Sequence, residues 1–175
     1  MEVAQSFERL DVPFQVYPGV KIRAGEFTFN ELHLLYNFGP QRAVSANVTV
    51  DTGQFYDGTR TGISTSRGRV QVGPQLTIEP GATVNFVKLP EGNFTSTLLN
   101  GRITYTVTPR MSTSVLMQYN SAAALLSMNA RFRWEYRPGS DIFVVLTDNR
   151  DTIPAGFPVL RNRSLIVKAT RLFRF

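Results

Sequence analysis

Polar and apolar residues alternate along most of this chain, and alternation of period two predicts β-strands. The clearest segment runs from Leu126 to Arg137. One set of alternate positions is mostly apolar and comprises Leu126, Met128, Ala130, Phe132, Trp134 and Tyr136. The intervening set is polar and comprises Ser127, Asn129, Arg131, Arg133, Glu135 and Arg137. Similar alternation in other segments predicts nine or ten antiparallel strands, beginning near Val12 or Phe27.

The length of these segments indicates what surrounds the apolar positions. At about ten to thirteen residues they exceed the usual strand of five or six. They match the nine to eleven residues that a strand needs to cross a bilayer at a tilt. We therefore predict an all-β fold, an antiparallel up-and-down transmembrane β-barrel or partial barrel. The alternative is a soluble all-β binding module, a lectin-like sandwich in which two apolar faces pack together.

Proline-containing segments between the alternating stretches predict tight turns. They are Gly39-Pro40-Gln41, Glu79-Pro80-Gly81, Thr108-Pro109-Arg110 and Arg137-Pro138-Gly139. Longer connections are expected at 54–60, 90–101, 120–124 and 148–162. Short turns at one end and longer loops at the other are typical of outer-membrane barrels. The start of the chain, from Met1 to Ser6, is polar and lacks the apolar core of a secretory leader. Residues Met1 to Leu10 are expected to hold at most a helical turn.

Aromatic residues gather near the predicted turns and at the end of the chain. Aromatic girdles mark the membrane–water boundary of barrels, and we assign Tyr36, Phe38, Trp134, Tyr136 and Phe173 to one girdle. The chain ends Leu172-Phe173-Arg174-Phe175. Bacterial outer-membrane barrels typically end in a strand with a terminal Phe that serves as an assembly signal, so Phe173 and Phe175 are predicted to form that signal. The alternative is a soluble edge strand that happens to end in Phe.

Composition narrows the chemistry. The chain has no cysteine, which removes disulfides, thiolate metal sites and cysteine nucleophiles. The net charge of +6 is carried mainly by arginines scattered through the chain, a pattern that argues against a nucleic-acid partner. The single histidine, His33, is expected on a lumenal or interfacial wall, and a catalytic triad would have to use it. Asp141, Asp148 and Asp151 offer oxygen ligands for calcium, although their spacing fits a solvated loop better. We expect no enzyme activity, cofactor or metal.

The polar positions of the clearest strand carry opposite charges. Arg131, Arg133 and Glu135 are predicted to face the lumen of the barrel. Rings of arginine in a lumen would select for anions. The alternative, which we favour, is a network of arginine and carboxylate groups that braces the barrel wall.

Two segments resemble a known family. Arg131–Val145 and Val167–Phe175 are similar to the carboxy-terminal part of a largely uncharacterised bacterial outer-membrane family, and 12–20, 101–109 and 117–120 are also similar. Full-length members carry an amino-terminal module resembling a family 9 carbohydrate-binding module. The resemblance implies that residues 1–175 form a single carboxy-terminal barrel segment of a longer protein in the outer membrane. It implies a structural or transport role, with glycans bound or taken up through a module outside this chain. The partners it implies are outer-membrane lipid, lipopolysaccharide and the barrel-assembly machinery.

Overall fold

The computed structural model describes residues 1–39, 41, 43–153 and 158–173, and the described chain is all-β. Within these ranges no helix is long and apolar enough to cross a membrane. The strands are β1 (Glu2–Leu10), β2 (Phe14–Tyr17), β3 (Val20–Ile22), β4 (Gly25–Phe38), β5 (Val44–Phe55), β6 (Gly58–Val72), β7 (Leu76–Leu89), β8 (Gly92–Thr108), β9 (Met111–Asn120), β10 (Leu125–Arg137), β11 (Ser140–Asp151) and β12 (Val159–Ala169).

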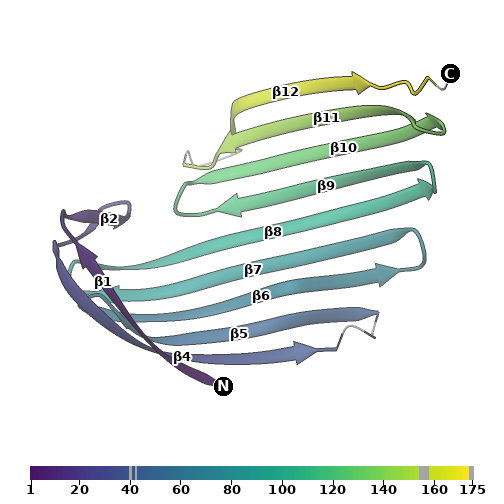
Figure 1. Cartoon of the computed structure of the whole chain (residues 1–175). Helices are drawn as coiled ribbons and strands as arrows, with labels where there is room; N and C mark the ends of the chain where they lie inside the picture. Colours follow the sequence, from purple (N-terminus) through teal and green to yellow (C-terminus); the bar gives the residue numbers. More distant parts are fainter. Residues whose placement is uncertain (40, 42, 154–157, 174–175) are drawn as a thin grey trace.

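Ten of these strands form one sheet in the order β1, then β4 to β12 (Figure 1). Every neighbouring pair is antiparallel, so the sheet is an up-and-down meander. The prediction of nine or ten antiparallel strands is confirmed by the ten-stranded sheet, but the predicted starting points are wrong. The sheet begins at β1, where a helical turn was expected, because Glu2–Leu10 pairs along its whole length with β4. Tertiary pairing overrides weak local preference here.

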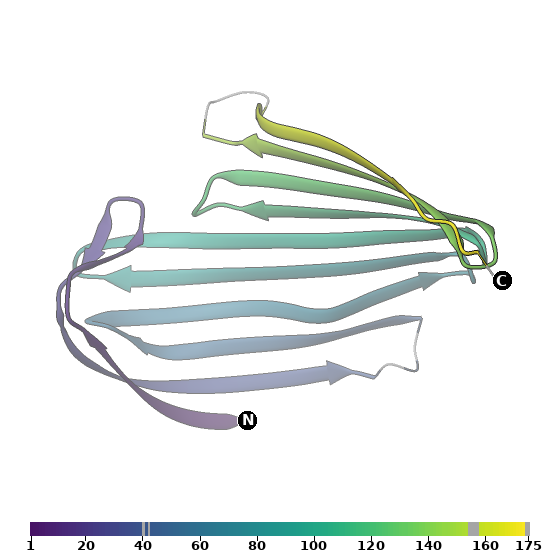
Figure 2. The same cartoon turned by 45° about the horizontal axis from the view of Figure 1, so that its top comes forward.

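The sheet is a single layer (Figure 2). Its accessible surface is 12023 Å², whereas a globular monomer of this mass would expose about 8,600 Å². The edge strands β1 and β12 each have one neighbour in the sheet, so the described strands do not close into a barrel. The sandwich alternative needs a second large sheet over the apolar side chains, whereas the second sheet among the described residues is only the two-stranded β2–β3.

The predicted connections need several corrections. Glu79, Pro80 and Gly81 lie inside β7, and the turn between β6 and β7 lies at 73–75 instead. Residues 92–101 belong to the strand β8 rather than to a long loop, and β11 extends to Asp151. Connections are therefore short at both ends of most strands. The turns predicted at Pro109 and Pro138 are confirmed, whereas the one at Pro40 falls on a residue outside the described ranges.

Pro80 is tolerated within β7 because β6 is irregular opposite it. The β6–β7 register shifts between Thr65 and Val70, and Arg67 has a positive φ of 51°. Proline has no N–H to donate, so it is found in sheets where the ladder is already interrupted. A bulge also bends the strand that carries it. The two irregularities are therefore one feature, in which β6 bends around the proline.

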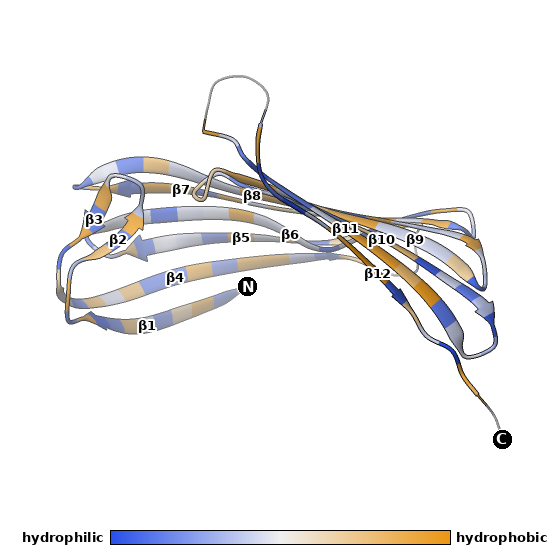
Figure 3. Cartoon of the chain, turned by 90° about the horizontal axis from the view of Figure 1, so that it is seen from above, coloured by the Kyte–Doolittle hydropathy of each residue, from blue (hydrophilic) through white to orange (hydrophobic). Residues whose placement is uncertain are grey.

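The buried core is small and lies at one end of the sheet. It consists of Val20, Ile22, Phe27, Phe29, Val87 and Leu89. The β2–β3 hairpin supplies Val20 and Ile22, and it stands over the end of the sheet near β4, β7 and β8 (Figure 3). The Tyr17 ring stacks on Phe94 of β8 at a centroid distance of 4.5 Å. The hairpin is thus the one place where apolar side chains of the described chain are enclosed in a second layer.

Candidate functional site

The strand register sorts the side chains of the sheet onto two faces. Directly paired residues of antiparallel strands share a face, so the faces can be traced from strand to strand. Phe132 is linked in this way to Thr113 and Val144, and Ala130 to Val115 and Leu146. The apolar face, traced across the sheet, includes Leu34, Val50, Ile63, Val84, Ile103, Val115, Ala130, Leu146 and Leu165. The opposite side is the polar face.

Large side chains on the apolar face are open to the surroundings. Leu34, Ile63, Phe86, Ile103, Met117, Leu165 and Val167 are each more than 40% exposed. Contiguous apolar surface of this extent is unusual on a soluble monomer and marks contact with another apolar medium or partner. Orange and blue alternate along the strands in Figure 3, as expected when neighbouring residues point to opposite faces.

The predicted girdle residues lie near one end of the sheet. Tyr36 and Phe38 form a T-shaped pair with centroids 4.8 Å apart near the end of β4, and Trp134 and Tyr136 form another at 6.3 Å near the end of β10. Tyr36, Phe38, Trp134 and Phe173 are all more than 40% exposed. The register adds Tyr105 to the apolar face near the end of β8. Phe175, the other half of the predicted assembly signal, lies outside the described residues.

Polar contacts connect strands across the polar face. His33 Nδ1 lies 2.6 Å from Asp51 Oδ1 on the neighbouring strand, and Arg60 donates a hydrogen bond to Glu31 at 2.5 Å. His33 Nε2 lies 3.9 Å from Glu31, which joins the four groups into one cluster over β4, β5 and β6. Such pairs satisfy polar groups that would otherwise be left without partners. No serine hydroxyl is hydrogen-bonded to His33 within the described chain, so the described contacts of His33 do not form a Ser–His–Asp triad.

Arg131, Arg133 and Glu135 occupy the same polar face. Arg133 Nε donates to Asp141 Oδ1 at 2.9 Å, and Arg131 Nε donates to Asn129 Oδ1 at 2.9 Å. Glu135 accepts a hydrogen bond from the Gly139 backbone at 2.9 Å, which ties it to the turn after β10. Arg133 and Glu135 therefore connect β10 with β11 and with the turn between them, and the bracing of a barrel wall stays a prediction. Whether this face lines a lumen stays a prediction.

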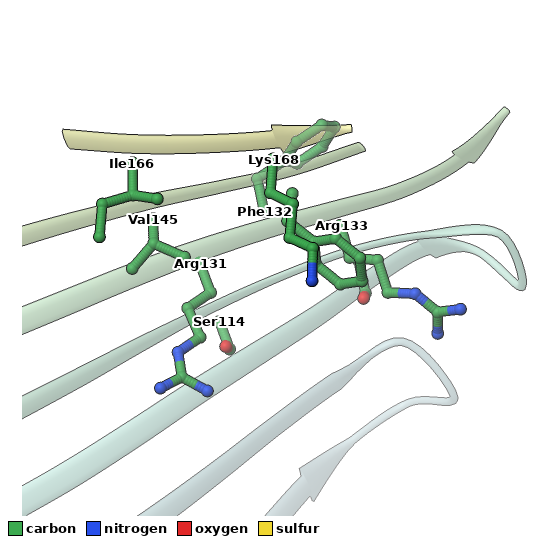
Figure 4. Close-up of a pocket in the computed structure, with 9 residues that line it drawn as sticks. Ser114, Arg131, Phe132, Arg133, Val145, Ile166 and Lys168 are labelled. Carbon is green, nitrogen blue, oxygen red and sulfur yellow. The ribbon is translucent and has the colours of Figure 1, made fainter. Parts of the chain in front are cut away.

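Beside these groups the polar face is hollowed. A depression of about 480 Å³ is lined by Ser112, Ser114, Arg131, Phe132, Arg133, Phe143, Val145, Ile166 and Lys168. Two rows cross the four strands from β9 to β12: Ser112, Arg133, Phe143 and Lys168 form one, and Ser114, Arg131, Val145 and Ile166 the other. Figure 4 shows the Ser114, Arg131, Arg133 and Lys168 side chains reaching away from the strands on the same side.

The three aspartates considered for calcium do not converge. Asp148 lies on the apolar side of the register and is 5% exposed, with its carboxylate held by Arg150 at 2.7 Å and by Arg163 at 2.6 Å. Asp141 is paired with Arg133, and Asp151 lies 3.6 Å from Arg161. Among the described residues no group of three or more acidic, histidine or cysteine side chains could hold a metal ion. The described residues therefore do not bring the three carboxylates together as calcium ligands, and the expected solvated loop is wrong because all three aspartates belong to strand β11.

An ion pair ties the hairpin segment to the sheet. Arg23, between β3 and β4, donates two hydrogen bonds of 3.0 Å to the carboxylate of Asp57 in the β5–β6 turn. These hydrogen bonds, and the Arg23 charge behind them, hold the pKa of the Asp57 carboxyl below its usual range. The charged carboxylate is thus favoured in the folded chain. Its contribution is present above the ordinary aspartate pKa of about 3.9 and is lost as the pH falls through the lowered value.

We expect Asp57→Asn to loosen the β2–β3 hairpin at pH 7 but not at acidic pH. The pair is largely exposed, so solvent screens it and its contribution at neutral pH is small. Hydrogen–deuterium exchange of 12–24, corrected for intrinsic rates, should show protection reduced several-fold in the variant at pH 7. Below the lowered pKa the two proteins should converge. A difference that persists unchanged in acid would show that the ion pair is not the cause.

Comparisons with protein families, with curated proteins and with solved structures found no match. The family resemblance described above therefore stays a prediction. Sequence reasoning missed Lys168, Ser112 and Ser114 as neighbours of Arg131. The only signal for them was their place in the polar alternation of their own strands, and grouping them requires the register between strands.

Proposed function

We propose that this chain forms the wall of a transmembrane β-barrel in a bacterial outer membrane, with a structural or transport role. The apolar face would contact lipid, and the polar face would line the lumen. The observation that carries the proposal is the uncovered apolar face of a single-layered sheet, with large side chains open across it. In water this surface would be strongly unfavourable, at about 25 cal/mol for each Å².

The dimensions of the sheet support this orientation. Strands β4 to β12 are 10 to 17 residues long, enough to cross a bilayer at a tilt. On β10 the apolar face extends from Leu126 to Trp134, a rise of about 26 Å along the strand at about 3.3 Å per residue. At the tilt of about 35 to 45° usual in outer-membrane barrels, that rise covers about 19 to 22 Å of the apolar band of about 25 Å found in them. The exposed aromatic residues lie near one end of this band.

The ends of successive hairpins are staggered in one direction. At three successive hairpin ends the later strand extends beyond the strand it pairs with. Val44 pairs with Val70 and β6 continues to Val72, and Leu76 pairs with Tyr105 and β8 continues to Thr108. Met111 pairs with Trp134, and β10 continues to Arg137. Stagger of one sense tilts the strands of a sheet that curls towards closure. The edge strands β1 and β12 run antiparallel to each other, as an even number of up-and-down strands requires.

Closure is needed in lipid because an open edge leaves backbone N–H and C=O groups without partners. We propose that the edges of β1 and β12 are paired in the membrane, either with each other or with further strands of a longer chain. The resemblance to outer-membrane proteins with a carbohydrate-binding module supports a link to glycans. Lipopolysaccharide and the barrel-assembly machinery would be the other partners.

Membrane extraction tests the proposal. The chain should be expressed with a secretory leader, and isolated outer membranes should be washed with alkaline carbonate and then with urea. We expect the protein to stay with the membrane until a detergent is added, because only lipid or detergent can cover the apolar face. A leaderless control should form aggregates. A monomer that remains in solution in buffer alone would contradict the proposal.

A further inference from the structure

We propose that the hollow over β9 to β12 binds a small amphipathic organic anion, in which a phosphate or carboxylate group is joined to an apolar portion. The site is built by Arg131, Lys168, Ser112 and Ser114 around an apolar floor. The proposal needs only the polar face of the sheet, whereas the membrane proposal depends on the apolar face. A chain that inserts into membranes but binds no anion would therefore contradict only the present proposal.

The charges of the hollow are not balanced. Three cations line it, Arg131, Arg133 and Lys168, and of these Arg133 is paired with Asp141 at 2.9 Å. Among the described residues no carboxylate oxygen lies within 4.0 Å of Arg131 or Lys168, and both side chains are exposed. Arg131 uses its Nε to bind Asn129, which orients the guanidinium and leaves its terminal N–H groups to donate. Fixed guanidinium and ammonium donors suit an oxyanion.

The hydroxyl groups stand in the same two rows as the cations. Ser112 is directly paired with Arg133, and Ser114 with Arg131. Directly paired residues have Cβ atoms about 4.5 to 5.5 Å apart, so a serine hydroxyl and a neighbouring guanidinium can reach the same oxyanion. Figure 4 shows Ser114 beside Arg131 below the ribbons.

The floor of the hollow is apolar although it belongs to the polar face. Phe143, Val145 and Ile166 lie next to one another on β11 and β12, between Arg131 and Lys168 in the register. The Arg133 guanidinium lies 5.9 Å from the centre of the Phe143 ring. Apolar walls with a few convergent polar groups are the usual form of a small-molecule site, and about 480 Å³ lies within the usual range of volumes. A bare inorganic anion would leave this floor uncovered.

Titration calorimetry of the full chain in a non-ionic detergent, with phenyl phosphate as the probe, tests the proposal. We expect saturable binding that weakens with salt. Arg131→Gln and Lys168→Gln should each reduce the affinity about tenfold, as expected for loss of one charge-assisted hydrogen bond. Lys168→Arg should keep most of the affinity. The matched control is Lys88→Gln, which removes the same charge from an exposed position on the opposite face and should bind like the unchanged protein.

Two further probes separate the parts of the site. Benzyl alcohol, which lacks the anion, and inorganic phosphate, which lacks the ring, should both bind at least tenfold more weakly than phenyl phosphate. Equal binding of either one, or an equal response of Lys88→Gln and Lys168→Gln, would overturn the proposal. Far-ultraviolet circular dichroism of each variant should match the unchanged protein, since the side chains of Arg131, Lys168 and Lys88 are all exposed. Absence of binding by a chain with that spectrum would also overturn it.

Discussion

Ala130→Arg is expected to lower the free energy of unfolding from lipid by about 2 to 4 kcal/mol, the cost of a cation near the middle of a barrel's lipid-facing band. Ala130 lies in the middle of β10, between Val115 and Leu146 on the apolar face. An arginine there would have to reach either end of the band to find water. Equilibrium unfolding from lipid vesicles in urea, followed by the fluorescence of Trp134, measures the difference.

The matched control is Ser127→Arg on the same strand. Ser127 pairs with Gln118 and Asn149, so its side chain lies on the polar face. We expect this variant to stay within about 0.5 kcal/mol of the unchanged protein, as surface substitutions usually do. If Ser127→Arg costs as much as Ala130→Arg, or more, the assignment of the two faces to lipid and lumen is wrong.

Ile22→Ala should release the β2–β3 hairpin from the sheet. Ile22 is 1% exposed and is the most fully buried large side chain of the described residues. Truncating a buried isoleucine costs about 2 to 5 kcal/mol, and the cluster around it is too small to share that loss widely. The local opening free energy of the hairpin, obtained from exchange of the backbone amides at 20–22, should fall by this amount.

The rest of the sheet should be little affected by Ile22→Ala, since β4 to β12 are held by their own ladders. Val12→Ala serves as the control, because Val12 is 70% exposed at the base of the same hairpin. Its effect should be below about 0.5 kcal/mol. Equal effects of the two substitutions would mean that the hairpin is not held by its buried face.

Alternation along the chain was sufficient to predict most of the sheet. The segment expected from Leu126 to Arg137 corresponds to β10, which begins one residue earlier. The period of two is a direct consequence of strand geometry, so it identifies both the strand and its two faces. The polar placement of Arg131, Arg133 and Glu135 followed from the same pattern. Long strands with uncovered apolar residues were thus predictable from local order alone.

Other elements depended on interactions between strands. Pro80 indicated a turn, but it lies within β7 because β6 bulges opposite it, and no local signal in β7 predicts that bulge. Strand β1 shows weak alternation and is held by its partner β4. The core of the hairpin was missed because β2 and β3 are only 4 and 3 residues long, too short to show a period.

The hollow illustrates the same limit for a site. Arg131 was recognised from its own strand, whereas Lys168 lies 37 residues further along the chain. They come together through the register that joins β10 to β11 and β11 to β12. Register is determined by turns and by the pattern of both strands together, so it cannot be obtained from one segment.

The two unpaired edges of the described sheet have a consequence for the behaviour of the chain in water. An exposed edge is a template on which strands of other molecules can add, and a flat apolar sheet then grows into fibrils. Strand β12 is exposed along its whole length, yet it carries Arg161, Arg163 and Lys168. Charged side chains along an edge discourage such growth through mutual repulsion. Arg161 and Arg163 are paired with Asp151 and Asp148, so the repulsion along this edge rests mainly on Lys168.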